Sequence, residues 1–116
     1  MEILGLVFAG TATDQSTEMS AFVAQTLGLP LAAVGGTDAD VFELPDGSCF
    51  AVHGPREEGD TARTIGFGVR DLDAAVAELR AAGVEVDDPQ ENERFRYAHF
   101  SAPDGKLYEL VADRSR

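Results

Sequence analysis

Residues 100–110 read FSAPDGKLYEL, and residues 42–52 read FELPDGSCFAV. Each stretch predicts a β-strand, a Pro-Asp-Gly turn and a second strand, because proline presets φ, aspartate accepts local hydrogen bonds and glycine tolerates positive φ. Pro103 follows Pro45 by 58 residues, which is half of the 116-residue chain. This spacing indicates that the chain consists of two related halves.

The correspondence continues upstream of both turns. Residues 4–8, LGLVF, precede Asp14 and a helical pattern of apolar residues, and residues 65–69, IGFGV, precede Asp71 and a second such pattern. The two aspartates lie 57 residues apart. Because the same elements recur in the same order and at the same spacing, we interpret the chain as a duplicated βαβββ module.

Local patterns predict the bounds of the elements in each half. In the first half we expect a helix from Asp14 or Ser16 to Leu27, and strands over residues 2–9, 31–34, 40–44 and 48–53. In the second half we expect a helix from Asp71 or Asp73 to Ala82, a short strand at 84–86, and strands over 64–70, 94–100 and 106–112. Residues 87–93 are expected to be loop. The polar, Gly- and Pro-containing residues 54–63 predict a linker between module 1 (1–53) and module 2 (64–116) of a single domain, 1–116.

Composition and charge exclude several classes of function. The chain carries 9 basic and 21 acidic residues, a net charge of −12, which disfavours nucleic acid and anionic membranes as partners and favours a cationic small molecule. The single cysteine, Cys49, excludes an intrachain disulfide. No apolar run approaches the roughly 20 residues of a membrane span, and no signal peptide is evident, so we expect a cytoplasmic protein.

The segments VRDLDAAVAELRAAGVEV (69–86) and FSAPDGKLYELV (100–111) resemble the glyoxalase / bleomycin-resistance / extradiol-dioxygenase superfamily, also called the vicinal oxygen chelate superfamily. The likeness covers nearly the whole chain and is strongest in the second half. It implies an α+β fold in which two βαβββ modules form one glyoxalase-like domain with a cupped mixed sheet. It also implies that the cup holds the ligand and that the protein is a homodimer.

Strand alternation predicts which side chains face this cup. The large apolar Ile65, Phe67 and Val69 are expected to pack on a helix, as are Leu4, Leu6 and Phe8 in the first strand. The residues then expected to line the cup and bind the ligand are Gly5, Val7, Cys49, His53, Thr64, Gly66, Gly68, Tyr97, His99, Leu107 and Glu109. The glycines either leave volume for a ligand or permit sheet twist and close packing.

The resemblance also implies four positions for metal ligands, and they fall on Ile3, Ala51, Thr64 and Glu109. A divalent metal needs several imidazole or carboxylate donors, and Glu109 alone supplies one. We therefore expect no catalytic metal and no cofactor. The alternative is one divalent metal at a displaced site in which His53, His99 and Glu109 form a facial triad.

Other polar residues allow two interpretations each. Glu109 is either a base or partner of a ligand cation, or a relic hydrogen-bonded to Thr64 or water. Cys49 is expected to be a buried structural thiol. Arg94 and Arg96 either contact an acidic ligand or balance charge, and the acidic stretch 87–93 is either a solvated loop or a rim that attracts cations.

Three functional hypotheses follow. The leading one is a small-molecule binding protein without a catalytic metal, similar to the superfamily's drug-sequestering members, with a cationic ligand favoured. The second is an enzyme of the lyase, isomerase or dioxygenase type that uses the displaced metal site, or a metal-free enzyme with Glu109 as general base. The third is a regulatory module that binds a protein partner.

Overall fold

The computed structural model describes residues 1–55 and 63–114. Its strands are β1 (Gly5–Ala12), β2 (Asp40–Glu43), β3 (Cys49–His53), β4 (Arg63–Gly68), β5 (Gln90–Glu91), β6 (Phe95–Ser101) and β7 (Leu107–Asp113). Its helices are α1 (Ser16–Ala21), which continues as the π-helical turn η1 (Phe22–Thr26), and α2 (Leu72–Ala81). Among the described residues, no helix is long and apolar enough to cross a membrane.

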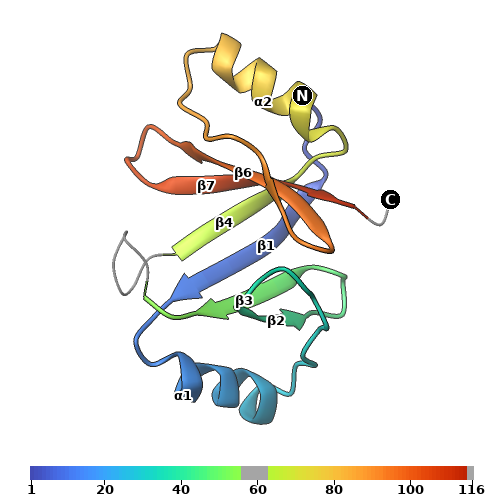
Figure 1. Cartoon of the computed structure of the whole chain (residues 1–116), viewed down its shortest axis with the longest axis vertical. Coiled ribbons are helices and arrows are strands. Elements are labelled where there is room, and N and C mark those ends of the chain that lie inside the picture. The colour runs from blue at the N-terminus through green and yellow to red at the C-terminus, as the bar shows by residue number, and fades with distance from the viewer. Residues whose placement is uncertain (56–62, 115–116) are drawn as a thin grey trace.

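All seven strands belong to one mixed sheet in the order β2-β3-β1-β4-β7-β6-β5. The two halves of the chain meet in the middle of the sheet, where β1 runs antiparallel to β4. On either side, β1 pairs in parallel with β3, and β4 in parallel with β7. Figure 1 shows α1 beyond β2 and β3 at one end of the molecule and α2 beyond β6 and β7 at the other. The α+β architecture with a mixed sheet is therefore confirmed, while the module boundaries stay a prediction.

The second helix forms where local signals predicted it. The Asp71 side chain accepts a hydrogen bond from the Ala74 backbone N–H at 3.0 Å, which caps the first turn of α2. Gly83, with a φ of 84°, ends the helix in the left-handed conformation that glycine adopts readily. The apolar side of α2 packs on β6 and β7 in a buried cluster of Val69, Leu72, Ala75, Val76, Ala98, Leu110 and Ala112.

The first helix differs from the expectation. It begins at Ser16 without a side-chain cap and turns into a π-helix at Phe22, with Val23 fully buried against Phe42 and Val52. The strand expected at 31–34 is reduced to a single bridge between Leu31 and Phe42. Pro30, which precedes it, has no N–H to donate to a ladder.

Two expectations in the second half also change. The short strand at 84–86 is a single bridge between Val86 and Phe100, and the loop expected at 87–93 contains the two-residue strand β5. Of the predicted linker, residues 56–62 lie outside the described part of the chain, and Arg63 already belongs to β4.

The first strand corrects the predicted side-chain directions. It runs from Gly5 to Ala12 instead of residues 2–9, and its pairing with β4 shifts register between Leu6 and Phe8. Such a bulge reverses the alternation of the residues that follow it. Phe8 therefore lies on the concave face, and the prediction that it packs on the outer face is wrong.

Candidate functional site

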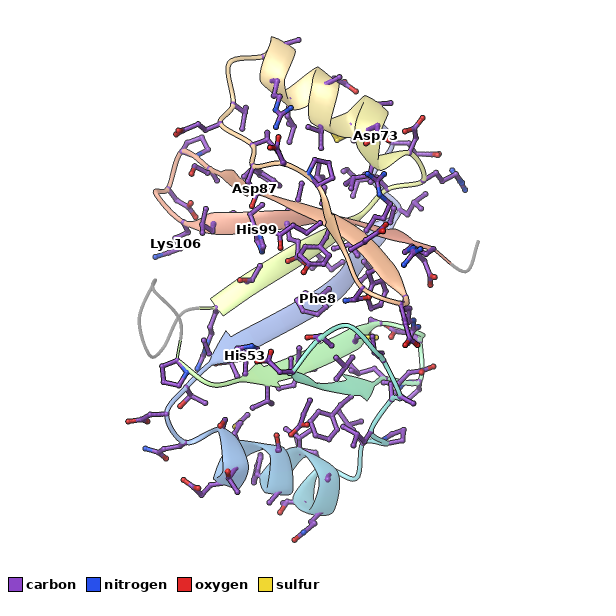
Figure 2. The ribbon with its side chains drawn as sticks, in the orientation of Figure 1. Phe8, His53, Asp73, Asp87, His99 and Lys106 are labelled. Carbon is purple, nitrogen blue, oxygen red and sulfur yellow. The ribbon has the colours of Figure 1, made fainter. Side chains whose placement is uncertain are left out.

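The concave face of the sheet forms an open cavity of about 920 Å³ between the two halves of the chain. Phe8, His53 and His99 lie around this space in Figure 2. A buried apolar cluster of Val41, Cys49, Ala51, Phe95 and Val111 joins the two halves, and all of its members except Cys49 line the cavity. The cavity is large enough for a small organic molecule. We refer to it below as the cup.

Six of the eleven residues predicted to line the cup do so, and five do not. His53, Thr64, Tyr97, His99, Leu107 and Glu109 line it. Cys49 belongs instead to the buried apolar cluster, and Val7 packs against that cluster. Gly5, Gly66 and Gly68 are not among the residues that line the cup. Sequence reasoning missed Phe8, Gly10 and Ala12, because the bulge in β1 is set by strand pairing rather than by a local signal.

Gly66 and Gly68 serve close packing rather than open volume. A Cβ at Gly66 would lie 2.9 Å from the Phe8 Cβ and 2.8 Å from Val111 Cγ2. A Cβ at Gly68 would lie 2.8 Å from Val7 Cγ1. At both positions the missing side chain makes room for neighbouring side chains, in agreement with the packing interpretation of these glycines.

Among the described residues, Glu109 is the charged residue that is buried, with 6% of its surface exposed. It lies on β7 directly opposite His99 on β6. Its Oε2 is 2.9 Å from His99 Nε2. An imidazolium and a carboxylate at this distance form a charge-assisted hydrogen bond, so the buried Glu109 has a partner within the protein.

Asp87 holds the other side of the same imidazole. Its Oδ2 is 3.2 Å from His99 Nδ1, and its Oδ1 accepts a hydrogen bond from the His99 backbone N–H at 2.7 Å. The hydrogen bond to Glu109, aided by the charges of Glu109 and Asp87, raises the pKa of His99 above 6.5, although partial burial opposes this. Both ring nitrogens face carboxylate oxygens, so the protonated imidazole, which donates from both nitrogens, satisfies both contacts.

His99 contacts one oxygen of Glu109 and leaves the other without that contact. Within the described chain, His99 is the hydrogen-bonding partner of Glu109, and it contacts Oε2. Glu109 lines the cup, and the contact with His99 does not involve its Oε1. Oε1 lies over β4, 3.4 Å from the position of a Cβ on Gly66. A hydrogen-bond donor in the cup would find its acceptor there.

His53 stands apart from this pair. Its Nε2 is 2.6 Å from Asp38 Oδ1, and its Nδ1 is 2.9 Å from the Gly54 carbonyl oxygen. The structure therefore does not bring His53, His99 and Glu109 together as the displaced metal site requires. Across residues 1–55 and 63–114, no three His, Cys, Asp or Glu side chains lie close enough to hold a metal ion.

The positions that the superfamily uses for metal ligands do not fit a metal either. Ala51 and Thr64 lie in the cup but supply no imidazole or carboxylate, and Ile3 precedes β1. Glu109 alone has a suitable donor, and its Oε2 is engaged by His99. The donor set at these four positions therefore does not match a divalent metal.

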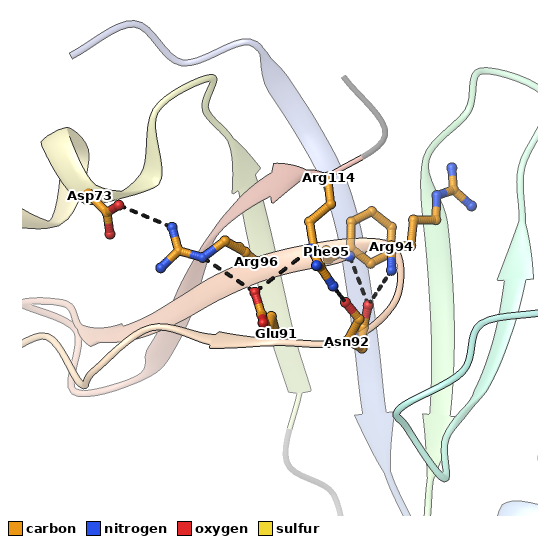
Figure 3. A network of polar contacts seen from close by, with 7 residues as sticks. All are labelled: Asp73, Glu91, Asn92, Arg94, Phe95, Arg96 and Arg114. Carbon is orange, nitrogen blue, oxygen red and sulfur yellow. Dashed lines mark hydrogen bonds and ion pairs between the residues drawn. The ribbon is translucent and has the colours of Figure 1, made fainter.

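The remaining polar candidates have structural partners. Arg96 bonds to Asp73 at 3.2 Å and lies 3.7 Å from Glu91, and Arg114 lies 3.8 Å from the same Glu91 (Figure 3). Arg94 lies 3.4 Å from Glu43. These contacts favour charge balance as the role of Arg94 and Arg96. Much of the acidic stretch 87–93 is neutralised in the same way.

Cys49 is buried beneath the cup. Desolvation raises the pKa of its thiol, although the charge of Arg94 opposes the shift. A buried thiol with a raised pKa is a poor nucleophile, which agrees with a structural role.

Comparison with known proteins agrees with this architecture. No family model and no curated protein matches the sequence. Methylmalonyl-CoA epimerase from Mycobacterium tuberculosis superposes with a TM-score of 0.77 at 20% identity, over 95% of this chain and 88% of that one. A variant of the Streptomyces coelicolor methylmalonyl-CoA epimerase in complex with 2-nitronate-propionyl-CoA gives 0.75 at 21% identity, over 97% of this chain and 99% of that one.

A hypothetical protein from Bacillus halodurans C-125 gives a TM-score of 0.75 at 18% identity, over 97% of this chain and 96% of that one. At these identities the likeness is one of fold, and it extends over nearly the whole chain. The resemblance noted in residues 69–86 and 100–111 is confirmed at this level. The chain has the fold of the glyoxalase / vicinal oxygen chelate superfamily.

Proposed function

We propose that this protein binds a small organic molecule in the cup, without a metal, and that Glu109 is the polar anchor of the ligand. The observation that carries the proposal is that Glu109, a buried carboxylate whose Oε1 is not contacted by His99, lines a cavity of about 920 Å³. The ligand presents a hydrogen-bond donor or a cationic group to Glu109 Oε1. Its apolar part contacts Phe8 and Phe95, which line the same cavity.

A thermal-shift screen of small molecules tests this proposal. A compound that binds the folded state raises the melting temperature as its concentration rises above its dissociation constant. Glu109→Gln should abolish or strongly reduce the shift, because an amide carries no charge for a cationic group. Glu18→Gln makes the same charge change on the exposed face of α1 and should leave the shift intact. A shift that survives in Glu109→Gln would contradict the role of Glu109.

Metal content separates this proposal from the metal-dependent alternative. Elemental analysis of untagged protein purified without chelator, before and after incubation with excess Ni, Mn, Fe, Co or Zn, should find no stoichiometric metal. A ratio near one metal per chain would overturn the metal-free proposal. Replacing His53, His99 and Glu109 in turn would then identify the ligands.

A second candidate is a metal-free acid–base enzyme. Glu109 Oε1 is placed to take a proton from a carbon next to a carbonyl group, whose oxygen receives the electron pair as an enolate; the same carboxyl group then returns a proton. His99 beside it favours this candidate, because its contact with Oε2 at 2.9 Å orients the carboxylate. Two of the structural neighbours are named epimerases of a CoA thioester.

Methylmalonyl-CoA in D2O tests the second candidate directly. Deuterium incorporation at the carbon between the two carbonyl groups, measured by mass spectrometry, should exceed the rate without protein and fall to that rate in Glu109→Gln. Incorporation no faster than in buffer would reject this substrate and leave the binding proposal as it stands.

We also propose that the protein is a homodimer, as the superfamily resemblance implies. Leu6 pairs with Phe67 across the centre of the sheet, and Ile65 lies on the same side of β4 as Phe67. Leu6 is 64% exposed and Ile65 41% exposed, which is apolar surface that a second copy would cover. Light scattering should give twice the chain mass for the wild type and the chain mass for Leu6→Glu. A monomeric wild type would contradict the dimer.

A further inference from the structure

The basic residues of this acidic chain are unevenly neutralised. Arg70, Arg80, Arg94, Arg96 and Arg114 each form an ion pair with a carboxylate within 4.0 Å. Arg63 and Lys106 form none with any carboxylate of residues 1–55 and 63–114. Both of these unpaired side chains line the mouth of the cup.

Strand register brings these two residues to the same end of the sheet. The strands β4 and β7 run in parallel with Gly66 opposite Glu109. Arg63 and Lys106 each lie three positions before these partners, where the two neighbouring strands begin. Lys106 is drawn at the outer edge of the sheet, beside the start of β4, in Figure 2. The two basic groups therefore form one edge of the cup, which we call the basic rim.

The described carboxylates near the basic rim are bonded to other groups. Asp104 lies two residues from Lys106, but its oxygens accept hydrogen bonds from the Tyr108 hydroxyl at 2.7 Å and from the Lys106 backbone N–H at 3.0 Å. Asp87 and Glu109, the carboxylates that line the cup, both contact the His99 imidazole. Among residues 1–55 and 63–114, no carboxylate therefore forms an ion pair with Arg63 or Lys106, although the charge of Asp104 acts on Lys106.

We infer that the basic rim binds an anionic group, a carboxylate, sulfonate or phosphate, on the molecule whose other end reaches Glu109. This inference rests on the proposed binding of a small molecule in the cup. Guanidinium and ammonium groups are the side chains that recognise such anions. Three residues of strand separate Lys106 from Glu109, which places their Cα atoms about 10 Å apart. The ligand is therefore bifunctional, with an anion at the mouth and a donor at the floor.

A matched pair of fluorescent probes tests the rim separately from the cup. The first probe is 1-anilinonaphthalene-8-sulfonate, and the second is N-phenyl-1-naphthylamine, which has the same rings and amine without the sulfonate. Both are titrated into wild type, Arg63→Gln/Lys106→Gln and the control Arg70→Gln/Arg80→Gln. The control removes the same charge from exposed residues that do not line the cup.

Loss of the basic rim should weaken binding of the sulfonate probe about tenfold and leave binding of the neutral probe unchanged, because only the sulfonate contacts the removed charges. The control should bind both probes as the wild type does. Added salt should lower the affinity of the wild type for the sulfonate probe but should barely change that of the rim variant. All variants are checked for an unchanged melting temperature.

The outcomes separate the two levels of the proposal. Equal binding of the sulfonate probe by wild type and rim variant, or an equal loss of both probes, would overturn the basic rim while leaving cup binding intact. Failure of the wild type to bind either probe saturably would instead count against the proposed small-molecule site itself.

Discussion

His99 Nε2 lies 2.9 Å from Glu109 Oε2, across directly paired positions of β6 and β7. The same imidazole contacts Asp87 through its other nitrogen. The ring is thus held between two carboxylates, one buried and one at the surface. Its protonation state controls whether the charge of Glu109 is compensated.

The pKa of His99 should fall when Glu109 is replaced. Glu109→Gln removes the largest cause of the raised pKa of His99. Glu18→Gln is the control, because Glu18 lies on α1 and does not contribute to the shift. An NMR titration that follows the Cε1 proton of His99 measures both. An unchanged His99 pKa in Glu109→Gln would show that Asp87 alone sustains it.

The free energy of unfolding should depend on pH through the same pair. Because the folded pKa of His99 is raised above 6.5, the stabilisation is fully present below pH 6.5 and is lost as pH rises through the folded value. Urea unfolding of wild type and His99→Gln across this range measures the difference. A difference that grows as pH rises would contradict the assignment.

Removal of His99 should destabilise the protein more than removal of His53. His99→Leu leaves Glu109 buried without its partner and should cost about 2 kcal/mol. His53→Leu breaks a pair with the exposed Asp38 and should cost under about 1 kcal/mol. The double variant His99→Leu/Glu109→Leu should recover part of the loss. Chemical denaturation checks all three, and equal losses for the two histidines would refute the burial argument.

Gly66→Ala should destabilise the protein by about 1–3 kcal/mol, because its Cβ would lie under 3.0 Å from both Phe8 and Val111. Gly54→Ala is the matched control, since a Cβ there meets no atom within 4 Å and its φ is not positive. Thermal melting of both variants measures the contrast. A Gly66→Ala protein as stable as Gly54→Ala would mean that β1 and β4 separate without cost.

Asp71→Ala should cost about 1 kcal/mol through the loss of the α2 cap. Asp88→Ala, which removes an exposed carboxylate paired with Arg80, should cost less than about 0.5 kcal/mol. Urea midpoints give both values. If the two variants lose the same amount, the cap contributes no more than a surface charge.

The second half of the chain could be predicted closely because its signals are local. Asp71 and Gly83 mark the ends of α2, and alternation along β6 and β7 correctly places Phe100 towards the helix and His99 towards the cup. In the first half, residues 5–12 are small or apolar with no clear period. Their register depends on pairing with β4, which no local pattern contains.

The candidate site could be predicted as a set of residues but not as a set of partners. Alternation placed His53, His99 and Glu109 on one face, as observed. It could not reveal that His53 pairs with Asp38 while His99 pairs with Glu109, because these contacts depend on loop paths and cross-strand register. The proximity of Arg63 and Lys106 depends in the same way on the parallel pairing of β4 with β7.

The central antiparallel pair of strands relates the two halves of the chain to each other. Phe8 and Gly66, 58 residues apart, are paired directly, so they occupy equivalent places on either side of a pseudo-twofold axis. The same spacing relates the paired residues His99 and Glu109 to Val41 and Ala51, which are also paired with each other. One half thus supplies an ion pair where the other supplies two apolar side chains. A nearly symmetric framework therefore encloses a polarised cavity, which would distinguish the two otherwise equivalent orientations of a bound ligand.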